Sequence, residues 1–253
     1  MTVNFRPTRR ATLVGLSALA VTGGRASAQA PKLAPKKGGT LTFLQTSEPN
    51  TLMSGITTAT SSLTNSGKVT EGLLEYDFDI KPKPGLATEW SISPDGLTYT
   101  FKLRPNVKFH DGKPFTSADV AYSIGMLKTV HPRGRNTFAN VIEVKTPDPL
   151  TAIIVMSKPA PFLIKALAAA ESPMVPKHIY DGTDPVTNPA NNAPIGTGPY
   201  KFKEWSRGNY VIFERNPDYW NPELPRIDRM VCKFVPDPGA RSVAFENGSG
   251  DIG

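Results

Sequence analysis

Proline is the feature that most limits what this chain can fold into. The 253 residues include 25 prolines, about twice the usual share of ~5%. Because proline donates no backbone hydrogen bond and its ring blocks the preceding helical turn, helices must be short and loops numerous. A long helical bundle is therefore excluded. Hydrophobic residues make up 39% and charged residues 20% of the chain, which also excludes a polytopic membrane protein and wholesale disorder.

Residues 1–28 have the pattern of a cleavable export signal. Basic residues, among them Arg9 and Arg10, precede the apolar stretch 11–22, and the small residues 26–28 (ASA) form a cleavage site. The apolar stretch is shorter than the ~20 residues that a membrane span needs. The sequence TRRATL around the arginine pair resembles a twin-arginine motif, and both the twin-arginine and the general secretory route stay open. We expect a periplasmic mature chain that begins with a linker over residues 29–37.

The charge balance and the scarce metal ligands exclude further classes. The formal charge of +7 falls to +3 without residues 1–28, since 25 basic and 22 acidic side chains remain. No basic run with interleaved aromatics is present, so we expect no nucleic-acid partner. The single Cys232 excludes an intrachain disulfide, and the three histidines lie in unrelated loops. We expect no metal site and no cofactor.

Hydrophobic spacing predicts strands joined by hairpins and interrupted by single helices. Alternation predicts strands at 40–45, 89–93, 97–103, 141–145, 150–156, 200–205, 210–214 and 229–235. Apolar spacing and capping residues predict helices from Leu63 to near Tyr76, from Thr116 onward, over 161–170 and over 239–246. Residues 172–199 read as loop. This order indicates an α/β fold with mixed sheets.

The sequence shows no catalytic arrangement. The glycine pair of 196–199 (GTGP) is followed by a strand, whereas a phosphate-binding loop opens a helix. A nucleophile elbow of the G-x-S-x-G type does not occur. We therefore expect a binding or scaffold protein and no enzyme.

Several ordered segments resemble one family, the periplasmic solute-binding proteins of ABC importers in the peptide, dipeptide and nickel class. They are 71–77 (EGLLEYD), 84–90 (PGLATEW), 107–115 (VKFHDGKPF), 116–122 (TSADVAY), 195–202 (IGTGPYKF), 216–220 (NPDYW) and 240–252 (ARSVAFENGSGDI). The resemblance covers residues 38–253 in register.

The resemblance implies a two-lobed clamshell that closes on its solute. Residues 38–54 and 194–253 would form the first lobe, and 55–193 an additional α+β domain. The second lobe would follow Gly253 and is absent from the sequence, so we expect the chain to be the N-terminal half of such a protein.

The resemblance also implies which residues contact the solute. Members bind solute partly through the loop before the EGLL segment, which corresponds here to residues 57–62 (TTATSS), with Thr58, Ala59 and Thr60 as the first-choice contacts. Arg135 and Phe138 are further candidates, because the additional domain can lean over the pocket. For both segments a solvated surface loop is the open alternative.

The implied function is capture of a peptide-like solute for delivery to an ABC permease at the inner membrane. We expect a monomer, with cleft closure and no covalent chemistry. The alternative is a truncated remnant that folds but does not trap solute.

Overall fold

The fold comes from a computed structural model that describes residues 37–253. The predicted signal peptide, 1–28, and all of the predicted linker except Lys37 lie outside these residues. Within the described part of the chain, no helix is long and apolar enough to cross a membrane.

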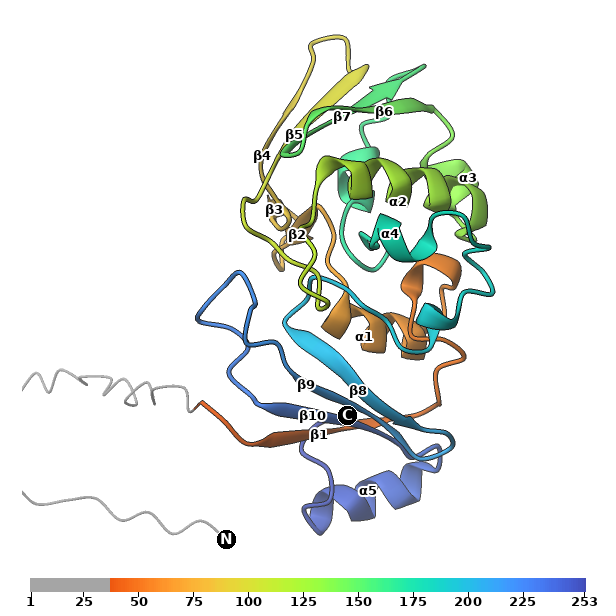
Figure 1. The fold of residues 1–253 in the computed structure, drawn as a ribbon. Coiled ribbons are helices and arrows are strands. Elements are labelled where there is room, and N and C mark those ends of the chain that lie inside the picture. Colours follow the sequence, from red (N-terminus) through yellow and green to blue (C-terminus); the bar gives the residue numbers. More distant parts are fainter. Residues whose placement is uncertain (1–36) are drawn as a thin grey trace, which may run out of the picture. The chain divides into compact units, whose positions relative to one another are not determined.

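The first sheet joins the start of the described chain to its last third (Figure 1). Its strand order is β1-β10-β9-β8, with β1 parallel to β10 and the other neighbours antiparallel. The strands are β1 (Thr40–Gln45), β8 (Tyr200–Ser206), β9 (Tyr210–Arg215) and β10 (Arg229–Phe234). Figure 1 shows the sheet between helices α1 (Thr60–Val69) and α5 (Pro238–Glu246). The four predicted strands and the C-terminal helix are confirmed.

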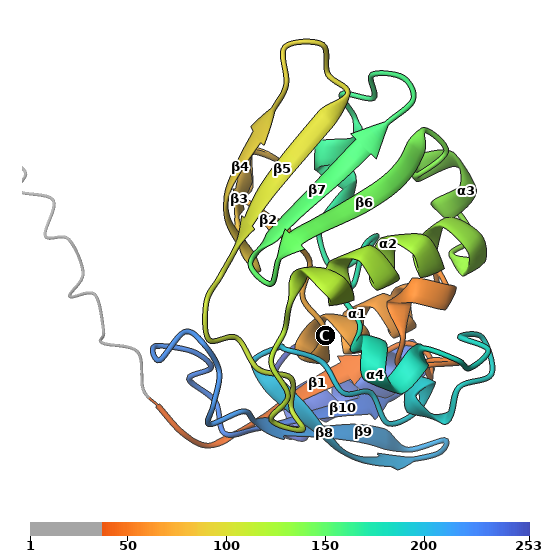
Figure 2. The same cartoon turned by 45° about the horizontal axis from the view of Figure 1, so that its top comes forward.

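The second sheet is an antiparallel meander with the order β4-β5-β7-β6. Helix α2 (Ser117–Val130) packs against it, as Figure 2 shows. The strands are β4 (Ala87–Ile92), β5 (Thr98–Leu103), β6 (Val141–Asp148) and β7 (Thr151–Met156). Both predicted hairpins are confirmed. The helix predicted after Thr116 is confirmed as well, and the Asp119 carboxylate accepts the Thr116 backbone N–H at 2.8 Å.

Shorter elements complete the fold. Strands β2 (Leu74–Tyr76) and β3 (Pro82–Pro84) pair as a small hairpin. The short helices are η1 (Ser54–Ile56), α3 (Gly134–Thr137), η2 (Leu163–Ala166), α4 (Lys177–Tyr180) and η3 (Pro189–Asn191).

Two hydrophobic cores lie one on each sheet. The smaller core consists of Leu52, Val69, Tyr200, Val211, Phe213, Met230, Cys232 and Phe234. The larger core lies between the second sheet and α2 and includes Tyr99, Phe101, Val120, Ile124, Leu127 and Phe138. Val69 belongs to the smaller core and Leu73 to the larger. The chain therefore passes from one core to the other within residues 70–72.

Two predicted helices are wrong in extent. The helix expected to reach Tyr76 ends at Val69, and the helix expected over 161–170 is only the short η2. One contact explains both, because the Leu74 N–H donates to the Leu167 carbonyl at 3.0 Å. A Cβ on Gly72 would lie 2.5 Å from that same carbonyl oxygen. The two backbones pair with each other at this point, so neither continues as a helix.

The loop predicted over 172–199 also holds the short helices α4 and η3. The cap of η3 is local, whereas the first N–H of α4, that of Lys177, donates to the distant Asp119 at 3.0 Å. In η3 the Asn188 side chain accepts the Ala190 backbone N–H at 2.8 Å.

Candidate functional site

A small pocket lies where β1 ends and α1 begins. In α/β sheets ligands bind beyond the carboxyl ends of parallel strands, and β1 and β10 form such a pair. The cavity has a volume of about 170 Å³. Its walls are Phe43, Leu44, Gln45, Thr46, Ser47, Thr60, Ser61, Thr64 and Gly253. We call it the β1 pocket.

The predicted loop residues lie beside this pocket. Thr58 and Ala59 are exposed and precede α1, and Thr60 is the exposed first residue of the helix. Only Thr60 lines the β1 pocket. The structure thus places one of the three predicted contacts in the pocket wall and the other two just before it.

Arg135 and Phe138 lie elsewhere, on and after α3. Arg135 is exposed, whereas Phe138 is 0% exposed and belongs to the larger core. Neither residue lines the β1 pocket. The structure therefore does not bring these two candidates together with Thr60.

Sequence reasoning missed a carboxylate that holds the loop after β1. Glu48 accepts the Trp205 indole N–H and the Gly208 backbone N–H, each at 3.0 Å. Its carbonyl oxygen accepts the Ser61 hydroxyl at 3.4 Å. Glu48 thus connects the β8–β9 turn to the start of α1. No local pattern signals this role, because the partners lie more than 150 residues away in the chain.

A second pocket, of about 530 Å³, is lined by asparagines and is the weaker candidate. The buried amides in its wall already have partners inside the protein. The Asn188 amide donates to Ile179 and Thr183, and the Asn191 amide donates to Pro185 and Val186. The N–H groups of these two amides are therefore not available to a ligand.

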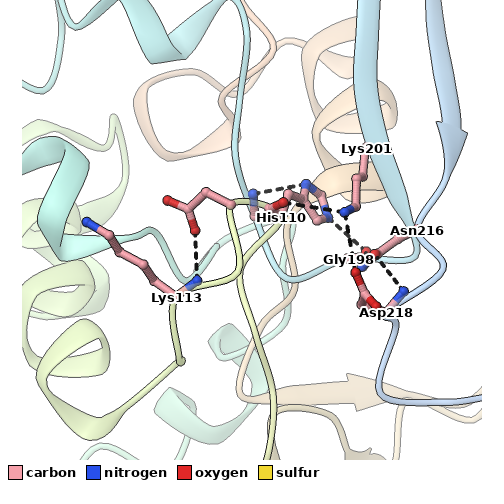
Figure 3. Close-up of polar contacts among 8 residues, drawn as sticks. His110, Lys113, Gly198, Lys201, Asn216 and Asp218 are labelled. Atoms are coloured by element: carbon pink, nitrogen blue, oxygen red, sulfur yellow. Dashed lines mark hydrogen bonds and ion pairs between the residues drawn. The ribbon is translucent and has the colours of Figure 1, made fainter.

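The predicted turns of 107–115 and 195–202 meet at His110 (Figure 3). His110 Nδ1 lies 3.4 Å from the Gly196 backbone N–H, which donates to it. Its Nε2 therefore carries the proton and donates to the Gly198 carbonyl at 3.0 Å. Burial lowers the pKa of His110 to about 4. A neutral histidine thus joins the two turns.

The segment 216–220 reaches the same turn. Asn216 donates from Nδ2 to the Gly198 carbonyl at 3.1 Å and accepts the Asp218 backbone N–H at the same distance. Figure 3 also shows Lys201 between His110 and Asp218. Its ammonium donates to the His110 carbonyl at 3.4 Å and lies 3.8 Å from the Asp218 carboxylate.

Glu71 contacts the 216–220 segment and lies where the chain passes between the two cores. Its Oε1 accepts the Tyr219 hydroxyl at 2.8 Å and the Trp220 indole N–H at 2.9 Å. Its side-chain Oε2 is buried without a hydrogen-bond partner among the described residues. Burial raises the pKa of Glu71 to about 7, and the polar side chains around it only partly offset that rise.

These perturbed groups fit a structural joint better than a catalytic or metal site. His110 and Glu71 use their hydrogen bonds to connect segments that are distant in the sequence. Within residues 37–253, no three His, Cys, Asp or Glu side chains are grouped as metal ligands.

The fold and the β1 pocket can now be compared with known proteins. A family model described as bacterial extracellular solute-binding proteins, family 5 Middle, matches residues 81–253. The chain belongs to this family. The match confirms the resemblance stated from the sequence motifs. It also confirms the predicted α/β fold class with mixed sheets.

Individual relatives agree with the family match. A Brucella ovis protein named as an ABC transporter peptide-binding protein is 34% identical over 187 residues, which cover 70% of this chain and 34% of the relative. NikZ from Campylobacter jejuni, solved with Ni(L-His), is 32% identical with a TM-score of 0.76, covering 86% of this chain and 43% of NikZ. The oligopeptide-binding protein AppA from Bacillus subtilis, solved with a nonapeptide, is 28% identical with a TM-score of 0.81, covering 87% of this chain and 44% of AppA.

The family 5 chain therefore spans about a third of the length of the curated relative and less than half of the two solved proteins.

Proposed function

We propose that this protein is the substrate-binding component of an ABC importer, which captures a peptide or a related small solute and delivers it to the membrane permease. The β1 pocket carries the proposal, because it lies at the sheet edge where α/β proteins bind ligands and is lined by the predicted contact Thr60. The family membership and the printed names of the relatives support it.

The proposed organisation has two parts. Residues 38–54 and 194–253 form the first lobe, and 55–193 form the additional domain. The smaller core supports this division, because every member except Val69 comes from the first-lobe ranges.

Four further elements complete the proposal. Residues 1–28 direct export to the periplasm and are removed there, and the mature protein acts as a monomer. It releases the solute unchanged and is not an enzyme. Thr58, Ala59 and Thr60 contact the solute directly, and Arg135 approaches it from the additional domain.

A thermal-shift assay tests the proposal. A ligand that binds only the native state raises the unfolding midpoint, by about 5 to 10 °C at a hundredfold excess over Kd. We expect a saturable rise with at least one member of a panel of dipeptides, oligopeptides and nickel complexes.

Matched variants locate the binding. Thr60→Tyr introduces a large side chain into the wall of the β1 pocket and should abolish the shift. Thr146→Tyr makes the same change at an exposed β6 residue that lines neither pocket, and should preserve it. A cooperative melt with no shift at millimolar concentrations of every solute would instead indicate a remnant that folds without trapping solute.

A further inference from the structure

Gln45 is the polar side chain best placed to select a ligand in the β1 pocket. It is the last residue of β1 and is only 5% exposed, yet it lines the pocket. A carboxamide that is buried to this degree normally has partners for both its oxygen and its nitrogen. The hydrogen bonds of Gln45 therefore indicate what the pocket offers to a ligand.

The orientation of the Gln45 carboxamide is determined by Asn65. The Asn65 Nδ2 donates to the Ser61 carbonyl at 2.7 Å, which identifies that atom as the nitrogen. The same Nδ2 donates to Gln45 Oε1 at 2.9 Å. The Gln45 oxygen is thereby occupied, and its Nε2 has no hydrogen-bond partner within residues 37–253. An unused N–H donor is thus held in the pocket wall.

The start of α1 provides further donors in the same wall. The N-cap residue Ala59 has no side chain that can cap the helix. Intrahelical hydrogen bonding in α1 starts at Leu63. Its backbone N–H donates to the Ala59 carbonyl at 3.0 Å. The N–H groups of Thr60 and Ser61 have no backbone partner among the described residues, and both residues line the pocket.

The pocket has no charged side chain of its own. None of its lining residues is Lys, Arg, Asp or Glu. The helix start nevertheless favours negative charge, because its aligned peptide dipoles leave a partial positive charge there. A carboxylate would find several N–H donors in this part of the wall, from Gln45 and from the start of α1.

We infer that the β1 pocket is a subsite for a carboxylate group of the solute, held by the Gln45 carboxamide and the free N–H groups at the start of α1. This inference rests on the proposed function and names the ligand chemistry of the same site. A cavity of about 170 Å³ holds one small terminal group and not a whole peptide. Gln45 is then the residue that separates solutes with a free carboxylate from those without one.

NMR with matched dipeptides tests the inference. The probes are L-alanyl-L-alanine and its C-terminal amide, which differ only in the carboxylate. We expect the free dipeptide to shift the side-chain amide signal of Gln45 and the backbone signals of Thr60 and Ser61 in a saturable way. The dipeptide amide should bind more weakly by a factor of about ten or more, because a hydrogen bond to a charged acceptor is stronger than one to a neutral acceptor.

Two variants separate the hydrogen bond from the fold. Gln45→Met removes both the free donor and the acceptor of Asn65 at similar size, and should weaken dipeptide binding about tenfold. Gln45→Glu keeps an acceptor for Asn65 but adds a negative charge, and should weaken binding further. Asn136→Asp adds the same charge at an exposed position with no side-chain hydrogen bond among the described residues, and should leave the affinity within about twofold.

The failure modes are distinct. The inference is overturned if millimolar dipeptide leaves the Gln45 signal unmoved. It is also overturned if the C-terminal amide of the dipeptide binds as tightly as the free acid. Either result counts even where other solutes still raise the unfolding midpoint. Absence of any stabilising solute in the thermal panel overturns the proposed function as well.

Discussion

At the residue scale, buried polar side chains connect distant parts of this chain. Asn65 and Gln45 join α1 to β1, and His110 joins two turns that lie more than 80 residues apart. Glu71 is costly to bury in its charged form, because it is 7% exposed and one of its oxygens has no hydrogen-bond partner among residues 37–253. Its neutral form suits the site better than its charged form.

Glu71 should therefore make stability depend on pH. Its pKa of about 7 lies above the ordinary value of 4.5, so the folded state binds its proton more tightly than the unfolded state. The contribution of Glu71 to the free energy of unfolding is complete below pH 4.5. It is lost as the pH rises through about 7, by up to ~3 kcal/mol. We expect Glu71→Gln, which keeps the shape without the charge, to raise the free energy of unfolding at pH 8 relative to the wild type.

Urea unfolding at pH 5 and pH 8 measures this effect. The lowered pKa of His110 changes stability in the opposite direction between pH 4 and 6.5, but equally in both proteins. The difference between variant and wild type therefore isolates Glu71. Glu75→Gln changes an exposed carboxylate nearby and should have little effect. A variant whose advantage did not grow with pH would contradict the assignment.

At the element scale, the glycines of the 196–199 turn allow it to pack against the end of α1. A Cβ on Gly196 would lie 2.1 Å from the Val69 carbonyl oxygen, and the Gly198 N–H donates to that oxygen at 2.8 Å. The turn thus supplies a partner to a carbonyl group in the last turn of the helix. Neither backbone can move away without breaking this hydrogen bond.

Gly196→Ala should consequently destabilise the protein by more than ~2 kcal/mol, because the new methyl group clashes with the backbone of Val69 and Thr70. Gly67→Ala is the matched control, since Gly67 is an exposed residue of α1 with no atom within 4 Å of an added Cβ. Gly67→Ala should raise the free energy of unfolding by ~0.5 to 1 kcal/mol. Thermal or chemical denaturation measures both, and equal midpoints for the two variants would disprove the close contact.

At the scale of the whole molecule, the chain crosses between the two cores more than once. It passes from Leu52 in the smaller core to Met53 in the larger, and again between the cores at 70–72, where the 195–202 and 216–220 segments meet through Gly198. Opening either core would expose the Glu71 and His110 hydrogen bonds. We therefore expect residues 37–253 to unfold as one cooperative unit.

Cys232 reports on this cooperativity. It is the single cysteine, is 0% exposed in the smaller core, and burial raises the pKa of its thiol to about 11. We expect labelling by a thiol reagent to follow the same denaturant midpoint as tryptophan fluorescence. Lys233→Cys in a Cys232→Ala background places the thiol at an exposed neighbour and should react at once. Labelling of Cys232 at a clearly lower midpoint would show that the smaller core opens by itself.

The sequence by itself determined the elements whose signals are local. Strand alternation predicted the bounds of β1 residue for residue, and turn and capping residues predicted both hairpins and the start of α2. The motif order predicted the family. Only the tertiary structure decided where α1 ends, because the backbone contact between Leu74 and Leu167 overrides the apolar spacing that runs on to Leu74. It also decided the roles of Gln45, Glu48 and Glu71, since their partners lie 20 to 160 residues away and no spacing along the chain encodes such contacts.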